Sequence, residues 1–361
     1  MENVIFFAKH MELGGLEKSL VNLLNSLDPA QYDVDLVLEE KHGPLLRELG
    51  DHVTVTEYRL SDCPFTLLRR GINLCKRLLW MVSHRNQYDF SCSYCTYSVI
   101  GSRLAQAASH NSCLYVHNDY TTIYPDPAEF RDFFRELRAD QFRKILFVSN
   151  ESREHFVGRL PELREKCATI NNIVDWKSVK AKAAEPCPVK KAEDETLFCF
   201  VGRFSEPHKR LSRLIEAFAI AHQTRTDIRL LLVGDGEDRP LVEALIGKYG
   251  LEHAVTLVGS QNNPYPYLNA SDCLVLSSDY EGFPVVYLEA LILGKDIITT
   301  IPVSDDRVDI GRLATIVEKT PESLGRAMAE YRFSGNAPLD MDAINKKRIA
   351  SLVDIMGVEK D

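Results

Sequence analysis

The fold of this chain is decided most clearly by residues 273–290, which run CLVL-SSDYEGFP-VVYLEA. The uninterrupted apolar run Cys273–Leu276 predicts a buried strand, and the apolar spacing after Pro284 predicts a helix. The polar loop between them carries Glu281, and Glu289 follows within the helix. A strand that ends in a polar loop before a helix is the repeating unit of an α/β fold with a parallel sheet.

This loop and helix start suit a ligand that carries both phosphate and hydroxyl groups. The amides of Gly282 and Phe283 are expected at the N-terminus of the helix, where hydrogen bonding and the helix dipole favour an anion. The carboxylates of Glu281 and Glu289 are suited to accept hydrogen bonds from sugar or ribose hydroxyls. The structural alternative is an acidic N-cap followed by a solvated helical glutamate.

A second motif lies at residues 200–210, which read FVGRFSEPHKR. A strand ends at Gly202, and the loop after it carries Arg203 and Lys209. Arginine offers a planar fork to phosphate oxygens and lysine a mobile point charge. Together they can stabilise a diphosphate leaving group as negative charge builds on it. A solvated basic loop is the alternative interpretation.

Outside these motifs, short apolar runs alternate with helical patterns, which favours βαβ units and parallel sheets. We expect two Rossmann-like doubly wound domains facing across a cleft, with ligands outside the carboxyl ends of the strands. The expected strands are 4–7, 34–38, 53–55, 113–116, 145–148, 197–201, 229–233, 255–258, 273–276, 297–300 and 313–317. The expected helices are 16–27, 211–222, 239–248, one from about Pro284, and 340–356.

The order of these segments predicts a domain organisation. Residues 1–176 form an N-terminal Rossmann-like domain on the acceptor side, and residues 196–335 a C-terminal one on the donor side. Residues 177–195 are rich in Lys, Glu, Ala and Pro, which indicates an exposed linker. After a break at Ser334–Pro338, the final helix of residues 336–361 is expected to pack back on the N-terminal domain.

Residues 277–290 resemble the E-x7-E signature of the family-four glycosyltransferases, which have the GT-B architecture. Gly-Arg followed by Lys209 and the turn VGDGE at residues 233–237 are similar to the same family. The resemblance is strongest over residues 197–293, and loosely includes members that build bacterial surface polysaccharides. It implies transfer of a sugar from a nucleotide diphosphate-sugar, expected to be a UDP-sugar, to a glycan or lipid-linked glycan acceptor. Transfer is expected to retain the anomeric configuration, without a metal or other cofactor.

The resemblance also implies roles for single residues. His117, Arg203, Lys209 and Glu281 are the expected catalytic residues, with His117 and Glu281 on the donor sugar. The expected donor-binding residues are Gly14, Gly15, Gly202, Arg203, Lys209, Gln261, Glu281, Gly282, Phe283 and Glu289. Gly14 and Gly15 belong to a G-G-x-E loop, whose alternative is a tight turn with no ligand. A lone histidine at a strand end is otherwise more often structural.

One segment departs from the family. Residues 302–307, after the expected strand 297–300, lack the family's paired glycines, so contacts from that edge of the site are in doubt. Two other functions stay open at this point: an isomerase like the nucleotide-sugar 2-epimerases, or a non-catalytic nucleotide-sugar binding subunit.

Composition narrows the class of protein. The 361 residues carry a formal charge of −9, so no global basic field favours nucleic acid. No apolar stretch is long enough for a transmembrane helix, and Met1–Phe7 resembles a first strand rather than a signal peptide. Nine scattered cysteines fit a reduced, cytoplasmic setting better than a disulfide framework.

Residues 64–85 combine five cations with apolar residues and no acidic residue. A basic amphipathic helix of this kind can lie on an anionic membrane surface. The expected docking residues are Arg69, Arg70, Lys76, Arg77 and Trp80, which would place the protein peripherally on the inner face of the plasma membrane. A domain helix with solvated charges is the alternative.

Overall fold

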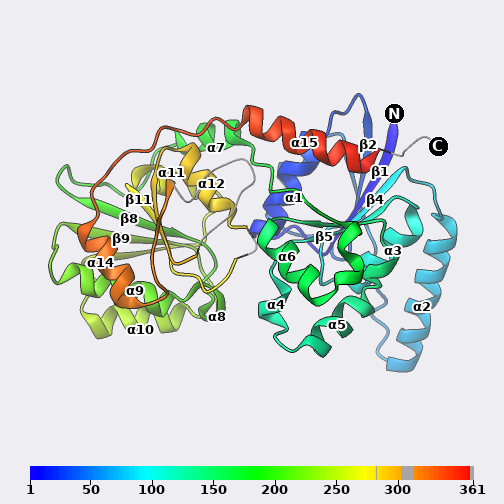
Figure 1. Ribbon diagram of the computed structural model, residues 1–361, viewed down its shortest axis with the longest axis horizontal. Helices are drawn as coiled ribbons and strands as arrows, with labels where there is room; N and C mark the ends of the chain where they lie inside the picture. Colours follow the sequence, from blue (N-terminus) through cyan, green and yellow to red (C-terminus); the bar gives the residue numbers. More distant parts are fainter. Residues whose placement is uncertain (282, 302–312, 358–361) are drawn as a thin grey trace. The chain divides into compact units, whose positions relative to one another are not determined.

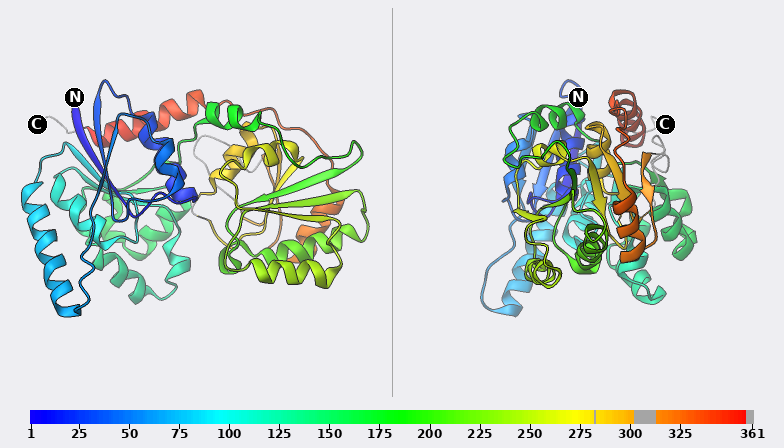
Figure 2. Two further views of the ribbon diagram at one scale, coloured as in Figure 1. Left: turned by 180° about the vertical axis from the view of Figure 1, so that it is seen from behind. Right: turned by 90° about the vertical axis from the view of Figure 1, so that its left-hand side faces the viewer.

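The computed structural model describes residues 1–281, 283–301 and 313–357. It contains two compact units. The N-terminal unit comprises Met1–Ile173 and Asn345–Asp361, and the C-terminal unit comprises Val174–Ile344. Each unit is a sheet of parallel strands with helices on both faces (Figure 1 and Figure 2), so two Rossmann-like domains are confirmed.

Within the described residues, the N-terminal unit holds a seven-stranded sheet in the order β3-β2-β1-β4-β5-β6-β7. Every pairing in it is parallel. The strands are β1 (Glu2–Ala8), β2 (Tyr32–Leu38), β3 (Val53–Glu57), β4 (Phe90–Ser93), β5 (Ser112–Val116), β6 (Lys144–Phe147) and β7 (Cys167–Thr169). The helices are α1 (Gly15–Ser26), α2 (Thr66–Ser83), α3 (Val99–Ala108), α4 (Tyr120–Ile123), α5 (Pro127–Glu136), α6 (Asn150–Arg159) and most of α15 (Asp342–Met356).

The C-terminal unit, as far as the structure describes it, has a six-stranded parallel sheet in the order β10-β9-β8-β11-β12-β13. In Figure 1, α9, α10 and α14 cover one face, and α7, α11 and α12 the other. The strands are β8 (Thr196–Val201), β9 (Ile228–Val233), β10 (Val255–Gly259), β11 (Cys273–Leu276), β12 (Asp296–Thr299) and β13 (Thr315–Ile316). The helices are α7 (Trp176–Ala183), α8 (Glu206–Lys209), α9 (Leu211–His222), α10 (Arg239–Tyr249), α11 (Tyr265–Ala270), α12 (Val285–Ile292) and α14 (Pro321–Glu330).

Both sheets reverse their strand order at one point, between β1 and β4 in the first and between β8 and β11 in the second. In open α/β sheets, ligands bind outside the carboxyl ends of the strands at such a switch point. The two motifs of residues 200–210 and 273–290 follow β8 and β11. The fold therefore brings them to the switch point of the C-terminal unit.

The core explains why the apolar runs become strands. All four residues of Cys273–Leu276 are buried, as is the whole of β5, because helices cover both faces of each sheet. Strand β4, whose sequence Phe-Ser-Cys-Ser is fully buried, was not predicted. Its polar appearance misled us: Ser91 Oγ donates to the Ala105 carbonyl of α3 at 2.7 Å. The short strand β7 was also missed.

The predicted linker of residues 177–195 is wrong in its first half, because this stretch contains most of helix α7. The Asp175 side chain accepts from the Ser178 amide at 3.0 Å and starts the helix. Val179 and Ala183 are buried, so two small apolar residues are enough to pack α7 near α11 and α12. The chain passes from the first unit to the second between Ile173 and Val174.

Candidate active site

The two motif loops of the C-terminal unit meet through an ion pair. Lys209, the last residue of α8, pairs its Nζ with Glu281 Oε1. Ser278 Oγ donates to the same carboxylate oxygen at 2.7 Å. Both charged side chains are largely but not fully buried, with 19% and 16% of their surface exposed. A cation and a carboxylate predicted from separate motifs therefore share one site outside the sheet edge.

The loop after β8 is shaped by close backbone packing. A Cβ on Gly234, which has φ +144°, would lie 1.9 Å from the Gly202 carbonyl oxygen. Gly234 of the VGDGE turn is therefore required by its packing against the motif of residues 200–210. A Cβ on Gly202 would lie 3.7 Å from Lys209 Cε. Arg203, next to Gly202, is exposed, so its guanidinium is accessible to a ligand.

Glu289 lies in α12 and is buried, with 8% of its surface exposed. Tyr265 Oη donates to Glu289 Oε1 at 2.8 Å, which orients the carboxylate. Helix α12 begins at Val285, and Pro284 is its N-cap with an extended backbone. The helix predicted from about Pro284 thus begins one residue later. Phe283 precedes this cap, while Gly282 lies outside the described residues.

Gln261 follows β10 and donates from Nε2 to the Val258 carbonyl at 3.2 Å. It borders a cavity of about 330 Å³ whose walls come from two segments of the C-terminal unit. The lining residues are Glu185, Pro186, Pro188, Ser260, Gln261, Asn262, Asn263, Pro266 and Tyr267. Gln261 therefore borders a space that a ligand could enter, and its role in donor binding stays a prediction.

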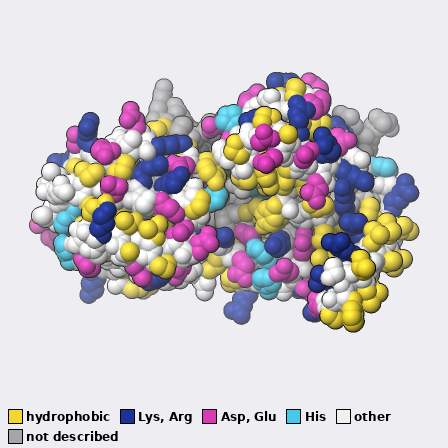
Figure 3. Space-filling view, turned by 90° about the horizontal axis from the view of Figure 1, so that it is seen from below, with side chains coloured by type: hydrophobic (Ala, Val, Ile, Leu, Met, Phe, Trp, Pro, Cys, Tyr) yellow, Lys and Arg dark blue, Asp and Glu magenta, His cyan; other side chains and the backbone are white. Residues whose placement is uncertain are grey.

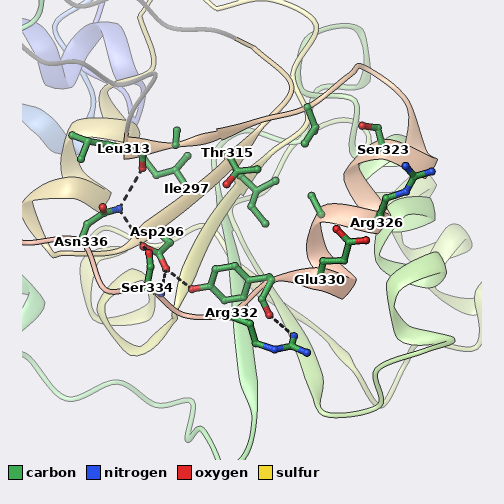
Figure 4. Close-up of a pocket in the computed structure, with 15 residues that line it drawn as sticks. Asp296, Ile297, Leu313, Thr315, Ser323, Arg326, Glu330, Arg332, Ser334 and Asn336 are labelled. Atoms are coloured by element: carbon green, nitrogen blue, oxygen red, sulfur yellow. Dashed lines mark hydrogen bonds between the residues drawn. The ribbon is translucent and has the colours of Figure 1, made fainter.

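A larger cavity of about 560 Å³ lies beside β12, β13 and α14 (Figure 4). Asp296, at the amino end of β12, accepts hydrogen bonds there from Tyr331 Oη and Ser334 Oγ, both at 2.8 Å. The motif residues instead follow the carboxyl ends of strands. We therefore assign this cavity to a structural network rather than to the active site.

In the N-terminal unit, His117 directly follows β5 and is buried, with 8% of its surface exposed. Its ring centroid lies 4.3 Å from that of Tyr94 and 4.6 Å from that of Tyr115. Burial lowers the pKa of His117 to about 3, so its imidazole is neutral near pH 7. Within the described residues, Nε2 has no hydrogen-bond partner. A buried polar atom of this kind lowers the stability of the folded protein unless a ligand or water forms a hydrogen bond with it.

The loop between β1 and α1 uses its two glycines differently. A Cβ on Gly14 would lie 2.2 Å from Glu17 Oε2, whereas one on Gly15 would meet nothing within 4 Å. Gly14 thus leaves room for the Glu17 carboxylate, which is 7% exposed and 3.5 Å from His10 Nδ1. Glu17 was visible in the sequence as the last residue of the G-G-x-E loop, but Tyr94 carried no signal because β4 was missed.

The basic helix α2 has apolar residues both against the core and exposed on its surface. Trp80 packs inward, 5.6 Å from the Phe7 ring and stacked on His84 at 4.2 Å. The prediction that Trp80 docks on a membrane is therefore corrected. A different set of residues, which we call the α2 stripe, is exposed along one side of the helix (Figure 3, right). The α2 stripe consists of Leu67, Leu74, Leu78 and Val82.

Residues 13–177 match the family described as Glycosyltransferase Family 4, and residues 182–330 match Glycosyl transferases group 1. The chain belongs to the family-four glycosyltransferases. These two matches cover both units and agree with the motifs at Glu281 and Lys209.

Curated relatives and solved structures extend the comparison. An Escherichia coli UDP-Gal:alpha-D-GlcNAc-diphosphoundecaprenol alpha-1,3-galactosyltransferase is 26% identical over 303 residues, covering 78% of this chain and 75% of that protein. A Campylobacter jejuni N-acetylgalactosaminyltransferase acting on a diphospho-undecaprenol substrate is 28% identical, covering 52% and 48%. The matches with three of the relatives cover only 39%, 48% and 59% of the length of those proteins.

Anabaena HepE, solved with UDP and glucose, has a TM-score of 0.76 at 18% identity and covers 98% of this chain and 100% of its own. The lipopolysaccharide glycosyltransferase WaaG has a TM-score of 0.66 at 14% identity, with 99% and 96% covered. At identities this low, the structural similarity establishes the fold alone. The GT-B architecture predicted from the sequence is confirmed.

Proposed function

We propose that this protein transfers a sugar from a nucleotide diphosphate-sugar, a UDP-sugar in particular, to a glycan or lipid-linked glycan of a bacterial surface polysaccharide. The observation that carries the proposal is the meeting of Lys209 and Glu281 at the switch point of the C-terminal unit. The named activities of the E. coli and C. jejuni relatives support it.

The charges of this site fit a donor with a diphosphate and a sugar. Arg203 and Lys209 neutralise the leaving diphosphate, whose negative charge grows in the transition state. Glu281 accepts hydrogen bonds from sugar hydroxyls, and Glu289 from those of the ribose. Because Lys209 also pairs with Glu281, the phosphate competes with this carboxylate for the ammonium group. We assign the neutralising role to these cations rather than to a divalent metal ion.

His117 is proposed to contact the transferred sugar. A pKa of about 3 makes its imidazole a weak base near pH 7, so we assign it to orienting a hydroxyl through Nε2 rather than to taking a proton. No carboxylate is assigned as a nucleophile. The acceptor hydroxyl attacks the anomeric carbon from the face that the phosphate leaves, and a phosphate oxygen takes its proton. The anomeric configuration is thereby retained.

Donor consumption tests the proposal directly. The full chain would be incubated with UDP-glucose, UDP-galactose and their N-acetylhexosamine counterparts, with and without EDTA, while release of UDP is followed. We expect slow hydrolysis of one donor, faster release with a lipid-linked acceptor, and no loss in EDTA. NMR of the product reports the anomeric configuration. No consumption of any donor would refute the activity, and abolition by EDTA would refute the metal-independent part.

We further propose that α2 docks on an anionic membrane, where a lipid-linked acceptor would be presented. Leu67, Leu78 and Val82 are 84%, 51% and 75% exposed, although a helix packed in a domain buries such residues. Arg69, Arg70, Lys76 and Arg77 lie on the same helix, which has no acidic residue. None of the helices in the described residues is both long and apolar enough to span a membrane, so the proposed mode is interfacial.

Co-sedimentation with vesicles tests the docking. Binding should rise with phosphatidylglycerol content and fall with salt, because each cation contributes about 1 kcal/mol near an anionic surface. Changing Leu78 and Val82 to Gln should abolish it, and changing the four cations to Gln should weaken it. Leu241→Gln, an exposed leucine of α10, is the matched control. Absence of wild-type binding at low salt would refute the docking alone.

A further inference from the structure

The two motif loops of the C-terminal unit are joined by backbone contacts as well as by the Lys209–Glu281 pair. The Asp279 amide donates to the His208 carbonyl at 2.9 Å. Ser277 Oγ donates to the carbonyls of Lys209 at 2.7 Å and Arg210 at 3.0 Å. The loop after β8 is therefore fastened to the loop after β11 directly beside the two charged site residues.

Asp279 is the charged centre of this junction. One of its carboxylate oxygens pairs with Arg210 Nε, and the other lies 2.6 Å from Arg213 Nη2. Arg213 Nη1 donates to the Ser277 carbonyl at 2.7 Å. Burial acts to raise the pKa of Asp279, but the hydrogen bonds from Arg210 and Arg213 outweigh it and lower that pKa. The carboxylate thus holds two arginines of the neighbouring segment.

Arg210 needs to be held, because its backbone is unusual. It has φ +50° between α8 and α9, a left-handed conformation that glycine adopts readily and arginine does not. Lys209 immediately precedes this residue, so the direction of the Lys209 side chain depends on the left-handed turn. Glu281 lies two residues after Asp279 on the other loop.

We propose that Asp279 is a positioning residue, which holds Arg210 in its left-handed turn and thereby sets Lys209 against Glu281. This inference rests on the proposed function, in which those two residues bind the donor. Asp279 itself touches neither substrate nor leaving group. Its effect passes through Arg210 and is supported by the contact of Arg213 with both Asp279 and Ser277.

Two variants separate positioning from ordinary structural support. Asp279→Asn removes the charge that holds Arg210, and we expect kcat to fall about tenfold, a usual coupling between neighbouring residues. Arg210→Gly supplies a residue that adopts the left-handed turn unaided. In the Arg210→Gly background, the same Asp279→Asn change should therefore lower kcat by less than about threefold. A purely structural ion pair would change the melting temperature without this rescue.

The matched control is Asp227→Asn, because Asp227 pairs with Arg225 at 2.6 Å beside the amino end of β9. It should leave kcat and the affinity for UDP, measured by calorimetry, unchanged. An active wild type whose Asp279→Asn variant keeps full kcat would overturn this inference alone, as would an equal loss in both backgrounds. A wild type that neither binds UDP nor consumes a nucleotide sugar would overturn the proposed function and this inference with it.

Discussion

The candidate residues of the two units are held in opposite ways. In the C-terminal unit, Lys209 and Glu281 neutralise one another, and Asp279 has arginines on both carboxylate oxygens. In the N-terminal unit, His117 sits uncharged between two tyrosine rings. The first arrangement suits charge that develops on a phosphate, and the second suits a neutral sugar hydroxyl. We therefore expect electrostatics to dominate ligand binding in the C-terminal unit, and shape and desolvation to dominate it in the N-terminal unit.

The largest expected effect tests the charged arrangement. Lys209→Ala should lower kcat, because it removes about 2–4 kcal/mol of transition-state stabilisation, the scale for loss of one electrostatic donor. Steady-state kinetics with the UDP-sugar that the wild type consumes measures it. Lys248→Ala, on the exposed side of α10, is the control and should have full activity. Unchanged turnover in a folded Lys209→Ala protein would remove this lysine from the mechanism.

The second prediction tests the uncharged arrangement through pH. The pKa of His117 is about 3 in the folded protein and about 6.5 when unfolded. Below pH 6.5 the unfolded chain binds a proton that the folded protein does not, so the stability due to neutral His117 is lost as pH falls. Between pH 7 and pH 5, wild type should lose about 2 kcal/mol of unfolding free energy relative to His117→Phe.

Denaturant titrations of both proteins across this pH range measure the difference, and the carboxylates common to both cancel in it. Parallel curves would mean that His117 is accessible to protons in the folded protein, and the contrast between the units would not hold.

The smallest expected effect sharpens the comparison within the N-terminal unit. Gly14→Ala places a Cβ against Glu17 Oε2, while Gly15→Ala meets nothing within 4 Å. The glutamate can swing away, so Gly14→Ala should cost less than about 1 kcal/mol of stability but displace the carboxylate. Gly15→Ala should be neutral or stabilising by up to about 1 kcal/mol, since Gly15 begins α1. Thermal melts measure the stability of both variants. Equal donor KM values for Gly14→Ala and Gly15→Ala would mean that the Glu17 carboxylate has no role in donor binding.

Local sequence pattern determined much of the fold. The apolar run Cys273–Leu276 became β11 and the segment Leu211–His222 became α9 with the predicted bounds, because burial on both faces of a sheet and on one face of a helix leaves a period in the sequence. Candidate residues at strand ends were predictable for a similar reason, since parallel strands carry their carboxyl ends to one edge.

Other features depended on contacts that no local pattern contains. Lys209 meets Glu281 across 72 positions of the chain, and this pairing required β8 and β11 to be neighbours in the sheet. Arg210 adopts a turn suited to glycine because Asp279, far along the sequence, compensates for it. Trp80 turned inward because Phe7 offered a buried ring. Sequence alone thus determined most of the strands and the chemical groups at their ends, whereas tertiary structure decided which groups meet, because long-range burial and charge pairing outweigh local preference.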